Sequence, residues 1–300
     1  MIEEKTTLIL GAGSSTHVGY PLGAGLLKNM CSIRMDKNYP QLPTKWSIND
    51  IDDLLISLSR SGHYSIDAFL ESSEYRDLGK YLIAYQLKQY EVVDNLFPPN
   101  DSGWFQILFN SLINKCGSDI GKNNLSIITF NYDRSLEAYL HNAIQHRFKL
   151  SSEEAWDKVS KVPLVHVHGV LGEYPKIDYQ PTCDFETLLS ISEKIRIIHE
   201  IEDNKSGYCN REFEIANGLL EKSERIVFLG FGFHDDNVRR FKYFSPEVME
   251  TRKVFSTSQG MTGFEYSQML DRLNKYGLKK ALGTHHGQAC DGLFRNYLTL

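Results

Sequence analysis

Five short apolar segments constrain the fold of this chain more than any other feature. They cover residues 6–10, 125–130, 162–167, 225–231 and 253–256. Apolar runs without polar alternation are typical of strands that are covered on both faces, as in parallel sheets. Each of the first four runs is followed by a glycine or polar cluster and then by helix-like sequence. The sequence therefore predicts an α/β fold with a Rossmann-like parallel sheet.

The stretch of about 100 residues between the first two segments is too long for a loop, and its pattern is helical. Ser65 has the side chain to cap a helix that starts at Ile66. Helical spacing recurs further on, at Leu78, Leu82 and Tyr85. Another helix is predicted over residues 102–115. We expect a single domain over residues 1–300, in which residues 24–120 are a helical insertion or lid.

A glycine-rich segment directly follows the first predicted strand. Its candidate phosphate-binding residues are Gly11, Ala12, Gly13, Ser14, Ser15, Gly19 and Pro21. Glycines let a backbone approach a phosphate, and a following helix N-terminus adds free N–H donors. The dehydrogenase fingerprint needs glycine where Thr16 stands, and an acidic residue after a second strand, and both are missing. The segment predicts a nucleotide loop of another kind, with a structural turn as the alternative.

Two further motifs follow predicted strands. Asn131 and Asp133 come after the second strand, where the ligand crevice of an open α/β sheet lies. The alternative is that they cap the helix that starts near Arg134. His166 and His168 end the third strand, and alternation places both on one face. A histidine there can act as a general base, and a metal ligand or a hydrogen-bonded structural histidine is the alternative.

A second glycine turn follows the fourth strand. Gly230 and Gly232 form it, and Asn237 follows in a polar helix start. A dinucleotide needs a second such turn because its two halves span the sheet. Capping of that helix by Asp235 or Asp236 is the alternative interpretation, and both can hold together.

The composition narrows the class of protein. Over 300 residues, 41% hydrophobic and 24% charged side chains are typical of a globular chain. A net charge of −5 argues against direct nucleic-acid binding. No apolar run spans a bilayer, and the start is unlike a signal peptide, so we expect a cytoplasmic protein without membrane contact. None of the 5 cysteines forms a Cys-x-x-Cys pair, so no metal site is expected.

The four motifs, in this order, resemble the sirtuin-like family of NAD-consuming enzymes. Their Gly-Ala-Gly-x-Ser loop with a later Gly-x-Pro is matched by Gly11, Ala12, Gly13, Ser15, Gly19 and Pro21. Their Thr-x-Asn-x-Asp motif is matched by Thr129, Asn131 and Asp133. Their His-Gly motif, which carries the catalytic histidine, is matched by His168 and Gly169. Their later Gly-x-Ser turn is matched more loosely, by residues 230–232.

The differences between this chain and the sirtuin deacylases indicate which branch of the family it resembles. Sirtuin deacylases carry a zinc module with two Cys-x-x-Cys pairs, which this chain lacks, and the long helical segment is additional. Both features resemble bacterial sirtuin-like effectors of antiphage defence, which hydrolyse NAD and starve the infected cell. The resemblance implies an NAD glycohydrolase that is gated by a regulatory protein partner or by homo-oligomerisation. The alternatives are a non-catalytic module that binds NAD or ADP-ribose, and an NAD-dependent deacylase or ADP-ribosyltransferase.

The resemblance also implies roles for the site residues. NAD is the substrate, with its pyrophosphate on residues 11–15. His168 is the general base, Asn131 positions the ribose or the attacking water, and Asp133 holds the nicotinamide amide or supports the developing cation. Thr129, Gly230, Gly232 and Asn237 complete the NAD-binding residues.

Overall fold

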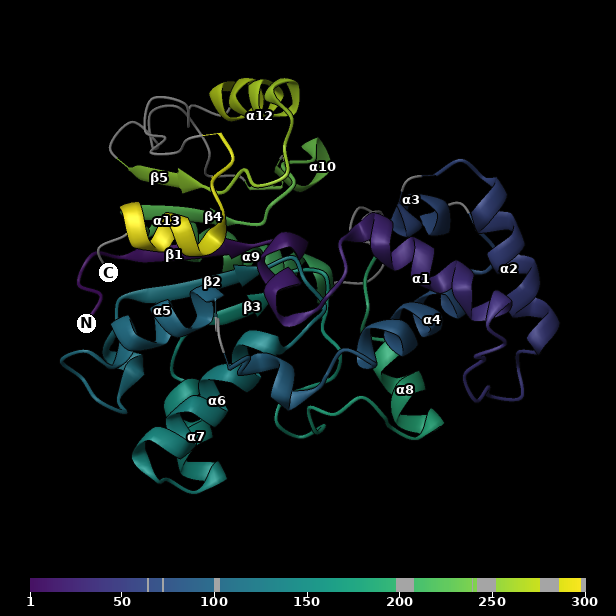
Figure 1. Ribbon diagram of the computed structural model, residues 1–300, viewed down its shortest axis with the longest axis horizontal. Coiled ribbons are helices and arrows are strands. Elements are labelled where there is room, and N and C mark those ends of the chain that lie inside the picture. The colour runs from purple at the N-terminus through teal and green to yellow at the C-terminus, as the bar shows by residue number, and fades with distance from the viewer. Residues whose placement is uncertain are drawn as a thin grey trace.

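A computed structural model describes the chain at residues 1–63, 65–71, 73–99, 103–197, 208–238, 240–241, 252–275 and 286–297. Its centre is one sheet of parallel strands in the order β3-β2-β1-β4-β5 (Figure 1). The strands are β1 (Thr6–Leu10), β2 (Leu125–Thr129), β3 (Leu164–His166), β4 (Arg225–Leu229) and β5 (Lys253–Ser256). All five predicted strands occur, although β2, β3 and β4 are shorter than predicted. The prediction of an α/β fold with a parallel sheet is confirmed.

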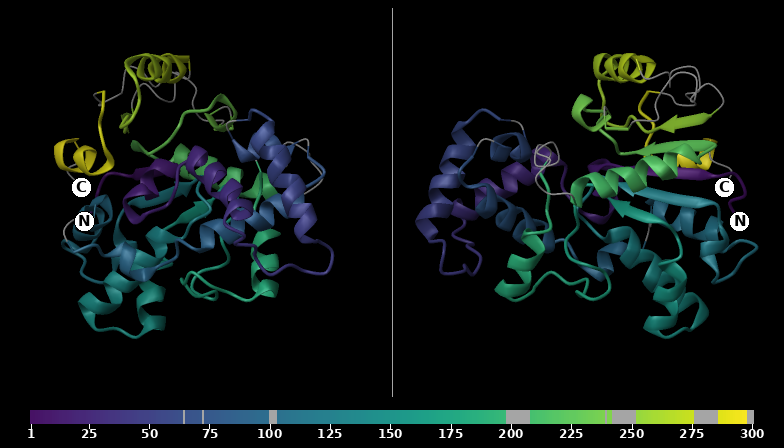
Figure 2. Two further views of the ribbon diagram at one scale, coloured as in Figure 1. Left: turned by 45° about the vertical axis from the view of Figure 1, so that its right-hand side comes forward. Right: turned by 180° about the vertical axis from the view of Figure 1, so that it is seen from behind.

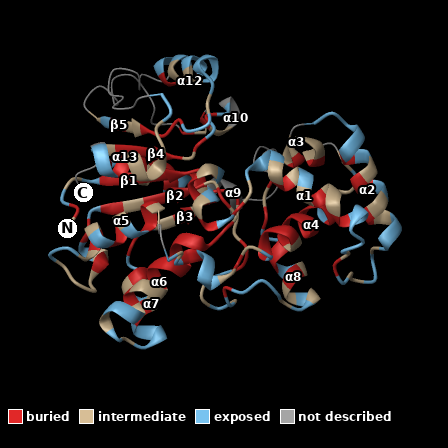
Figure 3. Ribbon diagram, viewed as in Figure 1, coloured by how far each residue is buried: buried red, intermediate tan, exposed pale blue. Residues whose placement is uncertain are grey.

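Helices cover both faces of the sheet, which explains why its central strands are almost wholly buried. Neighbouring residues of β1 show this division, because Leu8 packs in one buried cluster and Ile9 in another. The first cluster includes side chains of α5 (Gly103–Ile113), α6 (Ser135–Phe148) and α13 (Cys290–Tyr297). The second includes side chains of α9 (Tyr208–Glu221) and α12 (Gly263–Lys275). Figure 3 shows the central strands β1, β2 and β4 as almost wholly buried. The shorter α7 (Ser152–Val159) packs against α6.

The order of the strands places a crevice at one end of the sheet. From central β1, the chain extends the sheet through β2 and β3 in one direction and through β4 and β5 in the other. The last residues of β1 and β4, Leu10 and Leu229, are paired in register. The glycine turns that follow them therefore start side by side. In open α/β sheets, ligands bind at such a switch point, outside the carboxyl ends of the strands.

A group of helices, here named the helical lobe, lies beside the carboxyl ends of the strands (Figures 1 and 2). It contains α1 (Gly23–Met35), α2 (Ile48–Arg60), α3 (Ile66–Glu71), α4 (Arg76–Lys88) and α8 (Phe185–Ser192). As predicted, α3 begins at Ile66. Leu78 and Leu82 of the predicted helical stripe are buried in α4.

The helix α5 lies outside this lobe, although it falls within residues 24–120. It packs against α13 and α6. The remaining helical turns are η1 (Ala12–Val18), η2 (Val93–Leu96), η3 (Ile120–Lys122) and α10 (Asp235–Val238). No helix in the described ranges is long and apolar enough to cross a membrane.

Candidate active site

A cavity of about 550 Å³ lies between the carboxyl ends of the strands and the helical lobe. This volume falls in the range of small-molecule sites. The sheet side of its wall includes Gly11, Ala12, Gly13, Phe130, Asn131, Tyr132, Asp133, His168, Gly230, Phe231, Gly232, His234 and Asn237. The wall continues onto the lobe with Ala24, Leu26, Ser65, Asp67, Ala68 and Leu87. Tyr20, Pro21, Leu22 and Gly23 lie on the segment that joins the two.

The two glycine turns contact each other directly. The Gly11 N–H donates to the Leu229 carbonyl at 2.9 Å, and the Gly13 N–H donates to the Gly230 carbonyl at 3.0 Å. A Cβ at Gly230 would lie 2.0 Å from the Ser14 nitrogen, and one at Gly11 would lie 2.6 Å from the Gly230 oxygen. Glycine is therefore required at this contact, because any side chain would separate the two turns.

The segment after β1 differs from a simple loop-to-helix transition. It forms the short helix η1, which ends at Gly19 with φ 96°, and α1 begins only at Gly23. The first N–H groups of a helix have no acceptor within the helix. The first residue of η1, Ala12, lies on the cavity wall. Two of the first N–H groups of η1 are already bonded, because Gly13 donates to the Gly230 carbonyl and Ser14 donates to the Gly11 carbonyl, so the part of this segment that faces the cavity is the backbone at Ala12.

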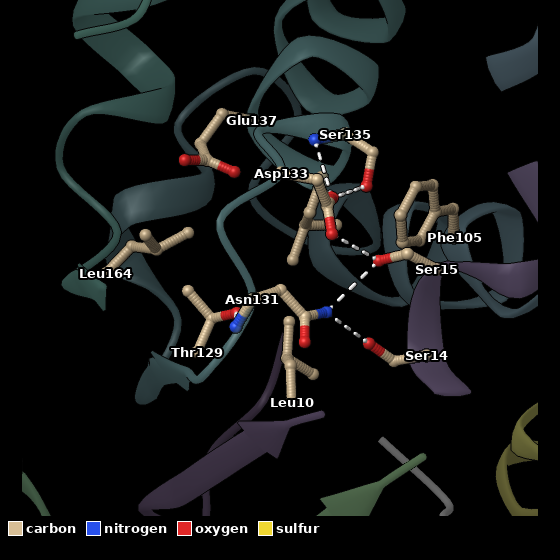
Figure 4. Close-up of a pocket in the computed structure, with 11 residues that line it drawn as sticks. Leu10, Ser14, Ser15, Phe105, Thr129, Asn131, Asp133, Ser135, Glu137 and Leu164 are labelled. Carbon is tan, nitrogen blue, oxygen red and sulfur yellow. Dashed lines mark hydrogen bonds between the residues drawn. The ribbon is translucent and has the colours of Figure 1, made fainter. Parts of the chain in front are cut away.

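Asn131 and Asp133 are tied to the first glycine segment from the end of β2 (Figure 4). The Asn131 amide donates to the Gly11 carbonyl at 3.0 Å and to the Ser14 and Ser15 hydroxyls at 3.3 and 3.2 Å. The Ser15 hydroxyl in turn donates to Asp133 Oδ2 at 2.9 Å. The amide, hydroxyls and carboxylate form one network that fixes both side chains.

Asp133 also caps α6. Its Oδ1 accepts from the Ser135 N–H at 3.1 Å and from the Ser135 hydroxyl. Burial raises the pKa of the Asp133 carboxyl, and the hydrogen bonds from Ser135 and Ser15 oppose that rise. Asp133 therefore both caps α6 and lines the cavity.

His166 and His168 do not share a face, so the expectation from alternation is wrong. The strand β3 ends at His166 and the chain turns at His168, so the two-residue period no longer applies. His166 Nδ1 lies 2.9 Å from the Asn131 carbonyl and Nε2 lies 2.7 Å from Glu137 Oε1. Burial by itself would lower the pKa of His166, but the Glu137 carboxylate and these hydrogen bonds raise it. His166 is a structural residue that holds the Asn131 backbone.

His168 has the opposite environment. Its ring packs edge-on against Phe130 and Phe213, and the residue is only 4% exposed. Within the described part of the chain, neither ring nitrogen has a hydrogen-bond partner, and neither does Asn237 Oδ1. Burial and the nearby Arg240 charge together lower the pKa of His168 to about 3, although the Asn237 side chain acts in the opposite direction. His168 is therefore neutral at pH 7, with two unpaired nitrogens at the cavity.

Most of the predicted site residues meet at this one cavity. Ten of them line it: Gly11, Ala12, Gly13, Pro21, Asn131, Asp133, His168, Gly230, Gly232 and Asn237. Ser14, Ser15 and Thr129 lie behind Asn131, around a second cavity of about 10 Å³ (Figure 4). Gly19 lines neither cavity and ends η1.

Sequence reasoning missed the residues that the helical lobe brings to the cavity. Asp67 accepts a hydrogen bond from the Tyr132 hydroxyl at 3.3 Å, across 65 positions of sequence. The local pattern predicted the helix that contains Asp67, but no local pattern indicates which distant strand that helix will face.

No metal centre is evident in the ranges that the structure describes, where no group of three or more histidine, cysteine, aspartate or glutamate side chains is suited to hold an ion. The site instead combines two glycine turns, an amide, a carboxylate and a neutral histidine. A parallel sheet with these groups at its switch point is typical of nucleotide-binding α/β proteins.

The family model of the SIR2-like domain matches residues 125–278, which run from β2 to beyond α12. The chain belongs to this family of SIR2-like domain proteins, which use NAD. The matched range contains Asn131, Asp133 and His168, and the first glycine segment precedes it. A comparison with curated proteins gives no match.

Proposed function

We propose that this protein is an NAD glycohydrolase that converts NAD and water into nicotinamide and ADP-ribose. The observation that carries the proposal is the His168 imidazole, buried at the cavity wall with two unpartnered nitrogens within the described structure. A buried polar group without a partner costs about 1–3 kcal/mol in the folded state. A ligand hydroxyl or water that bonds to this ring removes that cost.

The reaction requires little from the protein at the leaving group. The bond between ribose C1′ and the nicotinamide nitrogen breaks, and its electron pair neutralises the cationic ring. A water oxygen forms the new bond to C1′. His168 accepts one proton, from that water or from a ribose hydroxyl, and passes it to solvent. Because the leaving group is already cationic in NAD, a general acid is not needed to expel it.

The environment of His168 suits a base that becomes active with the substrate in place. Burial lowers the pKa of His168 to about 3, so the free protein holds a neutral but weak base. The pyrophosphate of NAD is anionic, and a nearby anion favours the imidazolium, so binding raises the pKa of His168. The substrate thereby strengthens the base that acts on it.

The other groups orient the substrate. The N-terminus of η1 at Ala12, beside the second glycine turn, binds the pyrophosphate. Asn131 positions the ribose or the water, and its contacts with Gly11 and Ser15 preorganise its amide. Asp133 lies beside it, where a carboxylate supports the developing positive charge at C1′.

The experiment is to incubate purified protein with NAD and separate nicotinamide and ADP-ribose by chromatography. We expect His168→Ala to reduce turnover by about 10²–10⁴-fold, the range for a lost general base. His146→Ala is the matched control, because His146 is exposed on α6 and does not line the cavity. Full activity of both His168→Ala and Asn131→Ala would refute the proposal.

The products separate this function from its alternatives. Free ADP-ribose identifies a hydrolase, whereas O-acetyl-ADP-ribose or labelled protein identifies a transferase or deacylase. Binding of NAD without nicotinamide release, in the presence of native partners, identifies a binding module. The unpartnered nitrogens of His168 favour the hydrolase, since a binding module does not need a base there.

We further assign the activity to a gated, NAD-depleting effector of bacterial antiphage defence, because uncontrolled hydrolysis would harm the cell itself. The helical lobe is the proposed lid, and it supplies one wall of the cavity through Ala24, Ser65, Asp67 and Leu87. A partner protein or self-association would act on this lobe. Turnover measured with and without co-purified partners tests the gate, and high turnover by an isolated monomer would contradict it.

A further inference from the structure

A buried cluster of charged side chains lies where the chain leaves the helical lobe. Lys88 ends α4, and Glu91 follows before the chain returns toward the sheet through η2. The side chains of Lys88 and Glu91 are 3% and 0% exposed, and the Lys88 ammonium donates to the Glu91 carboxylate. Arg134, which is also fully buried, forms a second ion pair with Glu91. Two cations from different elements thus share one carboxylate.

The Arg134 guanidinium joins distant parts of the chain. Its Nε and one terminal nitrogen donate to the two Glu91 oxygens, at 2.8 and 2.5 Å. The remaining bonds go to backbone carbonyls between β3 and α8, those of Ile177 at 2.7 Å, Asp178 at 3.1 Å and Gly172 at 3.5 Å. Because a guanidinium has five N–H donors in one plane, these bonds use its full capacity. The side chain is therefore fixed in orientation as well as in place.

Arg134 directly precedes the first residue of α6 and directly follows Asp133, whose carboxylate lines the cavity. A fixed Arg134 side chain therefore restrains the backbone from which Asp133 projects. The Asp133 carboxylate itself accepts hydrogen bonds from Ser15 and Ser135, which belong to the sheet side of the cavity. The ion pair with Glu91 adds a restraint that comes from the end of the helical lobe.

Two further connections between the sheet and the lobe meet this cluster. The carbonyls of residues 172–178 belong to the stretch that leads from β3 to α8, and α8 packs on α4 (Figure 1). Lys88 also donates to the Asp178 carbonyl at 2.9 Å. The next residue, Tyr179, has its hydroxyl 3.3 Å from that of Tyr20, on the segment that joins η1 to α1. A displacement of the lobe relative to the sheet must therefore act on this cluster.

Stability alone does not account for the buried charges. Burial lowers the pKa of Lys88 although the Glu91 carboxylate opposes this, so desolvation outweighs the attraction there. Apolar side chains of similar size often stabilise a fold as well as a buried ion pair does. What a planar guanidinium on a carboxylate provides is a defined geometry.

We propose that Arg134, held by Glu91, is a positioning residue that couples the helical lobe to the Asp133 carboxylate. This assignment rests on the proposed function, in which Asp133 supports the developing charge at C1′. Neither Arg134 nor Glu91 lines the cavity, so both act through Asp133 and not on the substrate. The lobe thereby affects the catalytic geometry as well as covering the cavity.

The test replaces Arg134 by lysine, which keeps the positive charge and loses the planar fork. We expect Arg134→Lys to reduce kcat for nicotinamide release by about 10-fold to 100-fold, since a displaced group costs up to about 100-fold in rate. KM for NAD should change much less, because the glycine turns that bind the substrate are untouched. Glu91→Gln keeps the size of the side chain and removes its charge, and it should lower kcat in the same way. It provides the test if Arg134→Lys does not fold.

A cluster of the same composition provides the matched controls. Glu4 pairs with Arg225 and Lys253 at the amino ends of β4 and β5, opposite the cavity. We expect Arg225→Lys and Glu4→Gln to leave kcat unchanged. A purely structural role of Arg134 would lower its unfolding midpoint in urea and leave kcat of the folded protein unchanged. Equal kcat values in Arg134→Lys and Arg225→Lys overturn the assignment.

The outcomes separate this inference from the proposed function. If the wild type and Arg225→Lys release nicotinamide, the hydrolase stands, and kcat of Arg134→Lys alone decides the positioning role. If the wild type does not cleave NAD, the hydrolase falls, and crystal structures of the wild type and Arg134→Lys decide the role instead. A carboxylate of Asp133 that moves away from the Ser15 hydroxyl, 2.9 Å away in the wild type, supports it. A carboxylate that stays in place overturns it.

Discussion

The Gly13 N–H donates to the Gly230 carbonyl at 3.0 Å and thereby joins the turns that follow two adjacent strands. Gly230 has φ 57°, and a Cβ there would lie 2.0 Å from the Ser14 nitrogen and 2.5 Å from the Gly13 Cα. We expect Gly230→Ala to lower the free energy of unfolding by at least about 3 kcal/mol and to abolish NAD turnover, because the backbone contact must open. Urea unfolding and the nicotinamide assay measure the two effects.

The control for that substitution is Gly218→Ala. Gly218 lies inside α9, and a Cβ there would meet nothing within 4 Å. Alanine is the better helix former, so the free energy of unfolding should rise by up to about 1 kcal/mol. Equal effects of the two substitutions would show that the contact between the turns is unimportant.

Acidification should destabilise the protein through His168. Burial lowers the pKa of His168 to about 3, whereas an unfolded histidine titrates near 6.5. Between these values the unfolded state binds a proton that the folded state does not, so stability falls as the pH drops below about 6.5. We expect the wild type to lose about 2 kcal/mol more than His168→Asn between pH 7.5 and pH 5. Urea unfolding at both pH values measures this, and parallel losses would contradict it.

His166 has the opposite pH dependence, which provides an internal control. Although burial opposes it, the Glu137 carboxylate raises the pKa of His166 above its ordinary value. A raised pKa contributes stability that is complete below about pH 6.5 and is lost as the pH rises through the folded pKa. His166→Asn should therefore cost more stability at pH 5 than at pH 8.5.

The sheet could be predicted from the sequence because its signal is local. A parallel strand covered on both faces is rich in apolar and β-branched residues, and residues 6–10 of β1 are all buried. The site motifs could be predicted for the same reason, since each directly follows a strand.

The contacts between distant elements left no such local pattern in the sequence. Asp67 meets Tyr132 across 65 positions, and the turn after His166 moves His168 to another face. Such contacts depend on how whole elements pack, which no short pattern encodes.

Asn131 provides a prediction about catalysis. Its amide donates to Gly11, Ser14 and Ser15, and its backbone carbonyl lies 2.9 Å from His166 Nδ1. A misplaced or missing orienting group costs on the order of 100-fold in rate, so Asn131→Ala should reduce kcat about 100-fold. Asn142→Ala is the control, because Asn142 bonds within α6, to the Ala138 carbonyl, and does not line the cavity. Equal kcat values in the two variants would remove Asn131 from the mechanism.

The last prediction concerns the support behind the first glycine segment. The Trp104 indole N–H donates to the Ser14 carbonyl at 2.8 Å, and the Trp104 ring stacks on Phe294 of α13 at 5.6 Å between centroids. Trp104→Phe keeps an aromatic ring there and removes the donor, which leaves a buried carbonyl without that bond. The cost should be about 1–3 kcal/mol in the free energy of unfolding.

Because the same carbonyl belongs to the segment that we propose to bind the pyrophosphate, Trp104→Phe should also weaken binding of ADP-ribose. Calorimetric titration measures that change, and circular dichroism in urea measures the stability. Trp46→Phe is the matched control, since Trp46 is half-buried in the helical lobe against Tyr81 and far in sequence from the glycine turns. If Trp104→Phe binds ADP-ribose as tightly as Trp46→Phe does, the indole supports only the fold, and the first glycine segment keeps its binding geometry without it.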